Sequence, residues 1–150
     1  MAFESLKQDH RKVADLFSQA EKATDEKQKQ QLFEQIKTEL ETHTQIEETV
    51  LYPTLQKHEE LKDYVLEAIE EHRQVKTLLQ EIERLTDGSE KFDAKLKVMK
   101  ENVEHHVEEE ENEMFPHAQK TLSKDELSAL EQELEAAKQS KSTSARSGKR

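Results

Sequence analysis

Residues 43–53 read HTQIEETVLYP, and residues 106–116 read HVEEEENEMFP. The two segments align at an offset of 63, so that histidine, Glu-Glu, Leu or Met, aromatic and proline coincide. The stretches before them also align, because Asp9-His10-Arg11 matches Glu71-His72-Arg73 at an offset of 62. The chain therefore consists of two related halves, and each half is expected to form a pair of helices.

The composition favours helix almost throughout the chain. Two Gly and two Pro in 150 residues leave few helix-breaking positions. We expect breaks at residues 23–25, 52–53, 86–89 and 115–116, with Gly88 after one helix and Ser89 capping the next. Hydrophobic residues make up 32% and charged residues 38%, against about 45–50% and about 25% in ordinary globular chains. The sequence predicts an all-α domain with four long helices and a narrow core.

The C-terminal region has a different character. The sequence Ser123-Lys124-Asp125-Glu126 is typical of a capping box, so residues 119–137 are expected to form a short accessory fifth helix. Residues 138–150 are rich in Lys, Ser, Thr, Arg and Gly and lack apolar periodicity. We expect a disordered basic tail there and assign it no function.

Several classes of function are excluded or disfavoured by the composition. The chain has no Cys, which excludes disulfides, thiolate metal sites and cysteine nucleophiles. It shows neither a secretion signal nor a run of about 18 apolar residues, so we expect a cytoplasmic protein without a membrane partner. The net charge of −11 argues against a nucleic-acid partner. The sequence leaves the oligomeric state open.

Apolar residues recur at alternating spacings of three and four, as on the inward face of a helical bundle. Each predicted helix carries one histidine in this stripe, and two helices add a glutamate one turn later. The four stripes are Phe3, Leu6, His10, Val13, Phe17, Ala20; Phe33, Ile36, Leu40, His43, Glu47, Val50; Val65, Ala68, His72, Val75, Leu79, Ile82; and Phe92, Leu96, Met99, Val103, His106, Glu110.

A single histidine on such a stripe is more often a hydrogen-bonded core residue than a ligand. Burial of four imidazoles and two carboxylates in so poor a core would cost several kcal/mol for each unpaired charge. Metal cations would compensate that cost. We therefore predict a metal site formed by His10, His43, Glu47, His72, His106 and Glu110. The repeat selects His106 and Glu110 over His105, Glu108, Glu109 and Glu111, which are expected on the solvated surface.

These motifs resemble the hemerythrin-like (HHE cation-binding) domain over residues 1–118. The resemblance implies an up-down-up-down four-helix bundle that holds two non-haem iron ions, with two histidines on each ion. It also implies that Glu47 and Glu110 bridge the ions beside an oxo or hydroxo ligand. Manganese or zinc would suit the same ligands. Oxygen-carrying hemerythrins have a further histidine where this chain has Lys76, which argues against reversible oxygen carriage of that kind.

The stripes predict a small, apolar cavity beside the metals, lined by Val13, Phe17, Val50, Val75, Leu79 and Val103. Such a cavity suits O2, NO or peroxide and offers nothing to orient an organic substrate. Lys76 is expected to extend to solvent, and Tyr52 and Tyr64 to serve mainly in packing. The leading hypothesis is a di-iron protein that binds or reduces a small oxygen or nitrogen species as a sensor, scavenger or store. Alternatives are iron storage or sensing without turnover, and an acidic scaffold with structural histidines.

Overall fold

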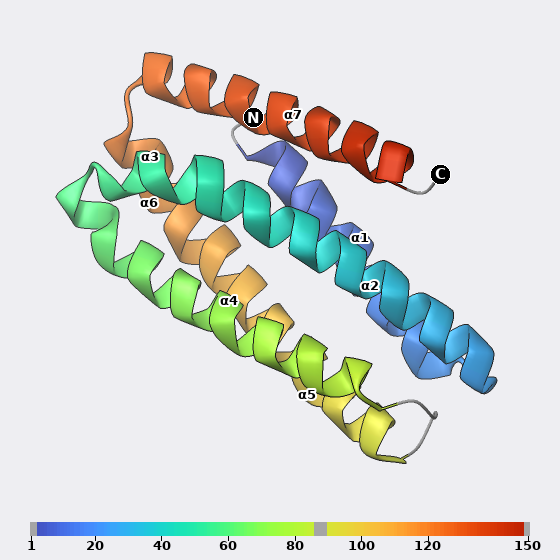
Figure 1. The fold of residues 1–150 in the computed structure, drawn as a ribbon. Helices are drawn as coiled ribbons and strands as arrows, with labels where there is room; N and C mark the ends of the chain where they lie inside the picture. Colours follow the sequence, from blue (N-terminus) through green and yellow to red (C-terminus); the bar gives the residue numbers. More distant parts are fainter. Residues whose placement is uncertain (1–2, 86–89, 149–150) are drawn as a thin grey trace.

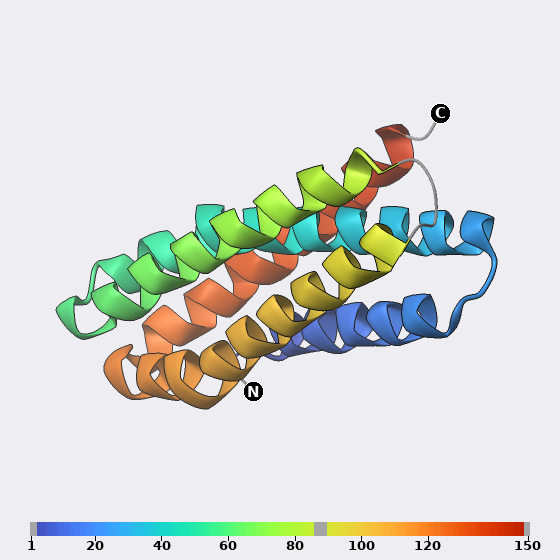
Figure 2. The same cartoon turned by 90° about the horizontal axis from the view of Figure 1, so that it is seen from below.

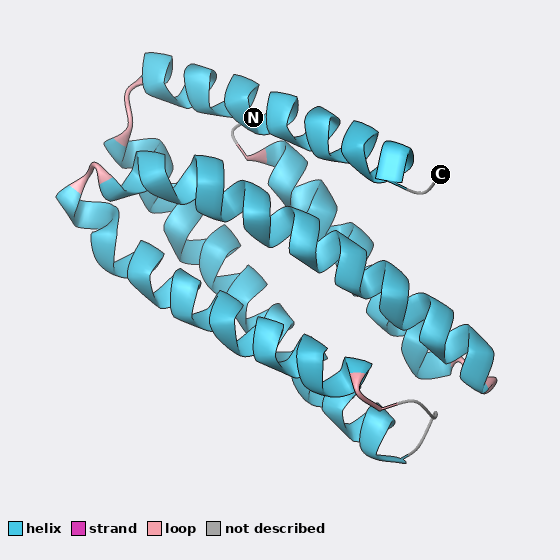
Figure 3. Cartoon of the chain, in the orientation of Figure 1, coloured by secondary structure: helices cyan, strands magenta, loops and turns pink. Residues whose placement is uncertain are grey.

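The computed structural model describes residues 3–85 and 90–148, with side chains through residue 140. This part of the chain contains helices and no strands (Figure 3). The helical segments are α1 (Glu4–Lys22), α2 (Glu26–Ile46), η1 (Glu47–Leu51), α3 (Tyr52–Gln56), η2 (Glu59–Leu61), α4 (Lys62–Glu83), α5 (Glu90–Glu109), η3 (Glu110–Met114), α6 (Phe115–Thr121) and α7 (Lys124–Gly148). They form four long rods that run alternately up and down, with α7 along the outside (Figures 1 and 2). The predicted all-α bundle is confirmed.

Side chains at two helix starts satisfy free backbone groups. The Gln28 N–H donates to the Asp25 carboxylate at 3.2 Å at the start of α2. At α7, the Glu126 N–H donates to Ser123 Oγ at 3.1 Å, and the Ser123 N–H donates to Glu126 Oε1 at 3.0 Å. This reciprocal pair confirms the predicted capping box. The predicted turn at Gly88 and Ser89 lies outside the described residues.

The core consists of two apolar clusters with a polar layer between them. One cluster contains Val13, Leu16, Phe17, Ala20, Ala23, Leu32, Phe33, Ile36, Leu40, Val75, Leu79, Ile82, Phe92, Leu96, Met99 and Val103. The other contains Phe3, Leu6, Ile46, Leu51, Tyr52, Leu55, Leu61, Val65, Ala68, Met114, Phe115, Ala118, Leu122, Leu130 and Leu134. The predicted stripes therefore face inward, and their histidines and glutamates occupy the layer between the clusters.

The two prolines do not close the second and fourth rods as predicted. Pro53 and Pro116 stand in the first turns of α3 and α6, which continue the rods beyond them. Proline is tolerated in the first turn of a helical segment because the N–H that it lacks would have no partner within the segment. The rods therefore extend to Gln56 and Thr121.

A π-helical turn begins at each stripe glutamate and shifts the inward face. The Tyr52 N–H donates to the Glu47 carbonyl, and the Phe115 N–H to the Glu110 carbonyl, each five residues back. Such turns are rare and frequently occur at functional sites. The wider turn carries an additional residue, so Val50 is only half-buried whereas Tyr52 is fully buried. The prediction that placed Val50 in the stripe was wrong for this reason.

The C-terminal helix is longer than the sequence predicted. α7 continues into the segment 138–150, which was expected to be disordered, and residues 149–150 lie outside the described part. Its buried Leu130 and Leu134 belong to the second apolar cluster, which holds the helix on the bundle. No proline interrupts the segment, and its Lys, Gln, Ala and Arg residues favour helix. Among the described helices, none has both the length and the apolar character needed to cross a bilayer.

Candidate metal centre

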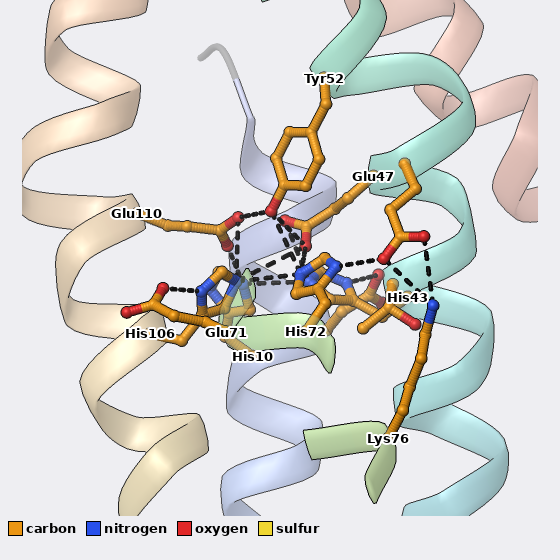
Figure 4. A network of polar contacts seen from close by, with 12 residues as sticks. His10, His43, Glu47, Tyr52, Glu71, His72, Lys76, His106 and Glu110 are labelled. Carbon is orange, nitrogen blue, oxygen red and sulfur yellow. Dashed lines mark hydrogen bonds and ion pairs between the residues drawn. The ribbon is translucent and has the colours of Figure 1, made fainter. Parts of the chain in front are cut away.

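The six predicted ligands meet in one layer of the bundle, and each of the four rods provides one histidine (Figure 4). His10 comes from α1, His43 from α2, His72 from α4 and His106 from α5, and all four are buried. The glutamates come from the starts of the two π turns. The side chain of Glu47 is 0% exposed and that of Glu110 is 1% exposed.

The four histidines form two pairs, His10 with His43 and His72 with His106. Each glutamate lies between the two pairs. Glu47 Oε1 is 3.0 Å from His72 Nε2, and Glu47 Oε2 is 3.3 Å from His43 Nε2. Glu110 Oε1 is 3.1 Å from His10 Nε2, and Glu110 Oε2 is 3.3 Å from His106 Nε2. Each carboxylate thus presents one oxygen to each histidine pair. The six side chains form two four-ligand groups that share both glutamates, and the ligand atoms of each group lie within 4.8 Å of one another.

In each of the four candidate histidine ligands, Nδ1 contacts a carboxylate from another helix. The four contacts are His10 Nδ1 with Glu111 Oε2 at 2.6 Å, His43 Nδ1 with Asp9 Oδ2 at 3.2 Å, His72 Nδ1 with Glu48 Oε2 at 2.7 Å, and His106 Nδ1 with Glu71 Oε1 at 2.6 Å. An ionised carboxylate accepts hydrogen bonds, so each Nδ1–H donates, and each Nε2 faces the centre, where it can bind a cation when the imidazole is neutral.

These four carboxylates were not predicted as part of the site. Glu111 was expected on the solvated surface, but its side chain is only 32% exposed and contacts His10. The internal repeat contained the signal, because Glu48 aligns with Glu111 and Asp9 aligns with Glu71. Asp9 and Glu71 each hold a histidine of their own half, whereas Glu48 and Glu111 each hold a histidine of the other half.

Replacing Glu111 with Ala is expected to weaken metal binding about 10–100-fold, because an unanchored His10 ring can rotate away. A competition titration against a chelator measures this change. Glu108→Ala removes an exposed carboxylate from the same helix and serves as the control. Equal affinities of the two variants would contradict the anchoring role.

The donor set fits a pair of cations. Within the described part of the chain, Glu47 Oε2 and Glu110 Oε1 are buried without a hydrogen-bond partner. Facing Nε2 atoms lie only 3.2 Å apart, both between His10 and His43 and between His72 and His106. Buried oxygen and nitrogen lone pairs that converge in this way are costly unless a cation or protons lie between them. Imidazole and carboxylate together suit iron, manganese or zinc.

When no cation is bound, protons on the imidazoles compensate the negative charge of the carboxylates. Burial opposes a charge on His43, but the Glu47 carboxylate and the Asp9 hydrogen bond outweigh it and raise the pKa of His43 to about 10. Burial likewise opposes a charge on His106, and Glu110 raises the pKa of that imidazole well above its usual range. Metal ions and protons therefore compete for the same nitrogens.

Tyr52 contacts the centre, although the sequence suggested a packing role. Its hydroxyl donates to Glu110 Oε2 at 2.8 Å and lies 3.2 Å from both Glu47 Oε1 and His72 Nε2 (Figure 4). Burial, together with these carboxylates, raises the pKa of the phenol well above its ordinary value, so it keeps its proton. The equivalent residue in the other half is Phe115, which makes the two halves chemically unequal.

Lys76 extends to the surface, in the direction that the sequence favoured. Its Nζ lies 3.2 Å from Glu48 Oε1, and its side chain is half exposed. Lys76 therefore touches the centre only through the carboxylate that holds His72. Tyr64 is partly buried and its ring lies against His117, as expected for packing.

A small cavity adjoins the four imidazoles. Its volume is about 20 Å³, and its walls are His10, Val13, Leu40, His43, Thr44, His72, Val75, Val103, His106 and Val107. A cavity of this size holds about one water-sized molecule. Of the predicted lining residues, Val13, Val75 and Val103 are present, whereas Phe17, Val50 and Leu79 are not among those that line it.

This arrangement of buried ligands agrees with a known protein family. The family model for the hemerythrin HHE cation binding domain matches residues 1–118. The chain belongs to this family. The match ends within α6, so the α7 helix lies beyond the region that this hemerythrin-like chain shares with the family model.

Individual relatives of this hemerythrin-like chain are distant in sequence. A DNA nickase from Nostoc sp. is 29% identical over 133 residues, which is 89% of this chain and 38% of that protein. An uncharacterised hemerythrin-like protein from Schizosaccharomyces pombe is 29% identical over 125 residues, or 82% of this chain and 62% of that protein. The chain thus spans less than two thirds of either relative. The crystal structure of a hemerythrin HHE cation binding domain-containing protein from Mycobacterium kansasii superposes with a TM-score of 0.81 at 26% identity, covering 97% of this chain and 90% of that one.

Proposed function

We propose that this protein holds two non-haem iron ions and uses them to bind or reduce a small oxygen or nitrogen species. The observation that carries the proposal is the pair of four-ligand groups that share Glu47 and Glu110. His10 and His43 would hold one ion, and His72 and His106 the other. Each ion then has at most four protein ligands, which leaves room for a small exogenous ligand. Bound iron would supply Lewis acidity and electrons for O2, NO or peroxide.

The surrounding residues favour a small and weakly polar ligand. The cavity beside the imidazoles is lined by four Val side chains, one Leu, the four imidazoles and Thr44, and it is too small for an organic substrate. Its hydroxyl-bearing residue, Thr44, donates to the Glu41 carbonyl at 3.3 Å. The Val and Leu residues of the cavity wall belong to or pack against one apolar cluster, whereas Tyr52 belongs to the other. The centre therefore has apolar walls on the cavity side and a hydroxyl donor on the glutamate side.

Iron storage or sensing without turnover is the second candidate. The engaged hydroxyl of Thr44 favours it, because the cavity then offers no free hydroxyl to donate a proton to a reacting ligand. The two candidates differ in peroxide consumption. A sensor or store would leave added peroxide intact, whereas a scavenger would consume it.

We also propose a cytoplasmic location without nucleic-acid or membrane partners. A net charge of −11 repels nucleic-acid phosphates and anionic lipid. The Nostoc relative is a DNA nickase, but this chain spans only 38% of that protein. We therefore do not propose DNA cleavage as the function of this chain.

Metal analysis of aerobically purified protein tests the proposal directly. We expect two irons per chain and the charge-transfer absorption of an oxo- or hydroxo-bridged pair. Protein from iron-supplied cells that carries no stoichiometric metal would contradict the proposal. It would then support the scaffold alternative, in which the histidines are structural.

A further inference from the structure

A second group of metal-ligating side chains lies at the surface between α4 and α5. It consists of Glu71, His105 and Glu109, whose ligand atoms lie within 4.8 Å of one another. His105 Nε2 is 2.9 Å from Glu109 Oε1 and 3.9 Å from Glu71 Oε2. The His105 side chain is 65% exposed, and the two carboxylates are partly exposed. One imidazole and two carboxylates open to solvent suit a hydrated divalent cation of the iron, manganese or zinc type.

This surface group is continuous with the buried centre. While Glu71 Oε2 faces His105, Glu71 Oε1 contacts His106 Nδ1 at 2.6 Å. A cavity of about 10 Å³ is lined by Glu71 and Glu109 of the surface group and by His106 and Glu110 of the centre. Glu110 is 1% exposed; its Oε1 faces His10 Nε2 at 3.1 Å, and its Oε2 faces His106 Nε2 at 3.3 Å. An anionic, buried carboxylate thus borders the same narrow space as the surface ligands.

The other half of the bundle lacks these ligands. By the internal repeat, the positions of His105 and Glu109 correspond to Thr42 and Ile46, and Ile46 is buried. The repeat also matches Glu71 with Asp9, whose Oδ1 is 3.0 Å from Lys138 Nζ on α7. A cation of the chain itself therefore occupies the place next to Asp9. At the equivalent position, one half thus has a lysine beside its carboxylate, whereas the other has the potential metal ligands His105 and Glu109.

We propose that Glu71, His105 and Glu109 form an outer site that captures a divalent cation from solvent and passes it inward to His106 and Glu110. The proposal rests on the proposed metal centre and adds the route by which that centre fills. Three exposed ligands bind more weakly than the buried groups, which suits a transient site. Glu71 belongs to both sites, because its two oxygens face His105 and His106.

Exchange of bound metal tests the proposed route. Protein loaded with zinc is mixed with isotopically enriched Zn²⁺, and the bound isotope is followed by mass spectrometry. The variant His105→Ala/Glu109→Gln retains Glu71, so it preserves the hydrogen bond to His106. We expect two zinc ions per chain at equilibrium. Exchange should be about tenfold slower or more, because the variant lacks two of the three ligands that attract the cation from solvent.

The matched control is His58→Ala/Glu126→Gln, which removes another imidazole–carboxylate pair at the surface, 3.1 Å apart. Glutamine preserves the capping box at position 126. The control should exchange at the wild-type rate. Equal rates in all three proteins would overturn the outer site while leaving the proposed centre intact. Loss of bound zinc from the His105/Glu109 variant would also overturn it, because the pair would then belong to the centre. Wild-type protein that retains no zinc would overturn both proposals.

Discussion

Protein with His106 replaced by Ala is expected to retain at most one metal ion per chain, against two in the wild-type protein. His106 provides one of the two imidazoles of its ligand group, and the remaining group would consist of His72 and two glutamates that the other ion also needs. Loss of an anchor to such a ligand already weakens affinity about 10–100-fold, so loss of the ligand itself should cost at least about 100-fold. Elemental analysis of the purified variant measures the outcome.

His105→Ala is the internal comparison, because it removes the neighbouring imidazole from the same helix. His105 is exposed whereas His106 is buried, so the His105 variant should still hold two ions at equilibrium. Circular dichroism establishes that both variants remain helical. If the two variants lost metal equally, the assignment of the inward-facing histidine would be wrong.

Addition of iron to metal-depleted protein is expected to raise the melting temperature by about 10 °C. A ligand that binds only the folded state stabilises it by about 4 kcal/mol at a free concentration 1,000 times its Kd. For a chain of this length, each kcal/mol corresponds to about 2–4 °C. The gain arises because the ions compensate Glu47 and Glu110 in the core. Calorimetric scans with and without iron measure the shift.

The His106→Ala variant should lose most of this gain. Its melting curve is the control for iron that binds elsewhere on the acidic surface. Superimposable scans of wild-type protein with and without iron would count against a metal centre inside the core. Stabilisation of equal size in the variant would assign the effect to surface binding.

The inward faces of the four long helices could be predicted from sequence because burial in a bundle imposes a regular spacing. The same regularity placed the four histidines and two glutamates in one layer, and all six lie there. The spacing failed after Glu47, where a π turn inserts a residue and brings Tyr52 inward in place of Val50. Such a turn leaves no mark on a pattern of apolar residues.

The carboxylates that hold the imidazoles were hidden for another reason. Glu48, Glu71 and Glu111 lie beside the inward stripes and resemble the many other acidic residues of a solvated helix face. Their partners are on other helices, so only the packed bundle brings them together. A helix that includes Leu130 and Leu134 was expected, whereas its continuation to Gly148 was not, because residues 138–150 carry no apolar periodicity.

The charges around the centre would influence which oxidation state of a bound metal pair is balanced by the protein alone. Six carboxylates meet there, two between the histidine pairs and four behind the imidazoles: Asp9, Glu47, Glu48, Glu71, Glu110 and Glu111. Lys76 and Lys138 neutralise two of these charges. With neutral imidazoles, the remainder equals the charge of two divalent cations. If the proposed iron pair is oxidised, two trivalent ions would leave an excess of positive charge in the interior, which would favour the entry of small anions from solvent.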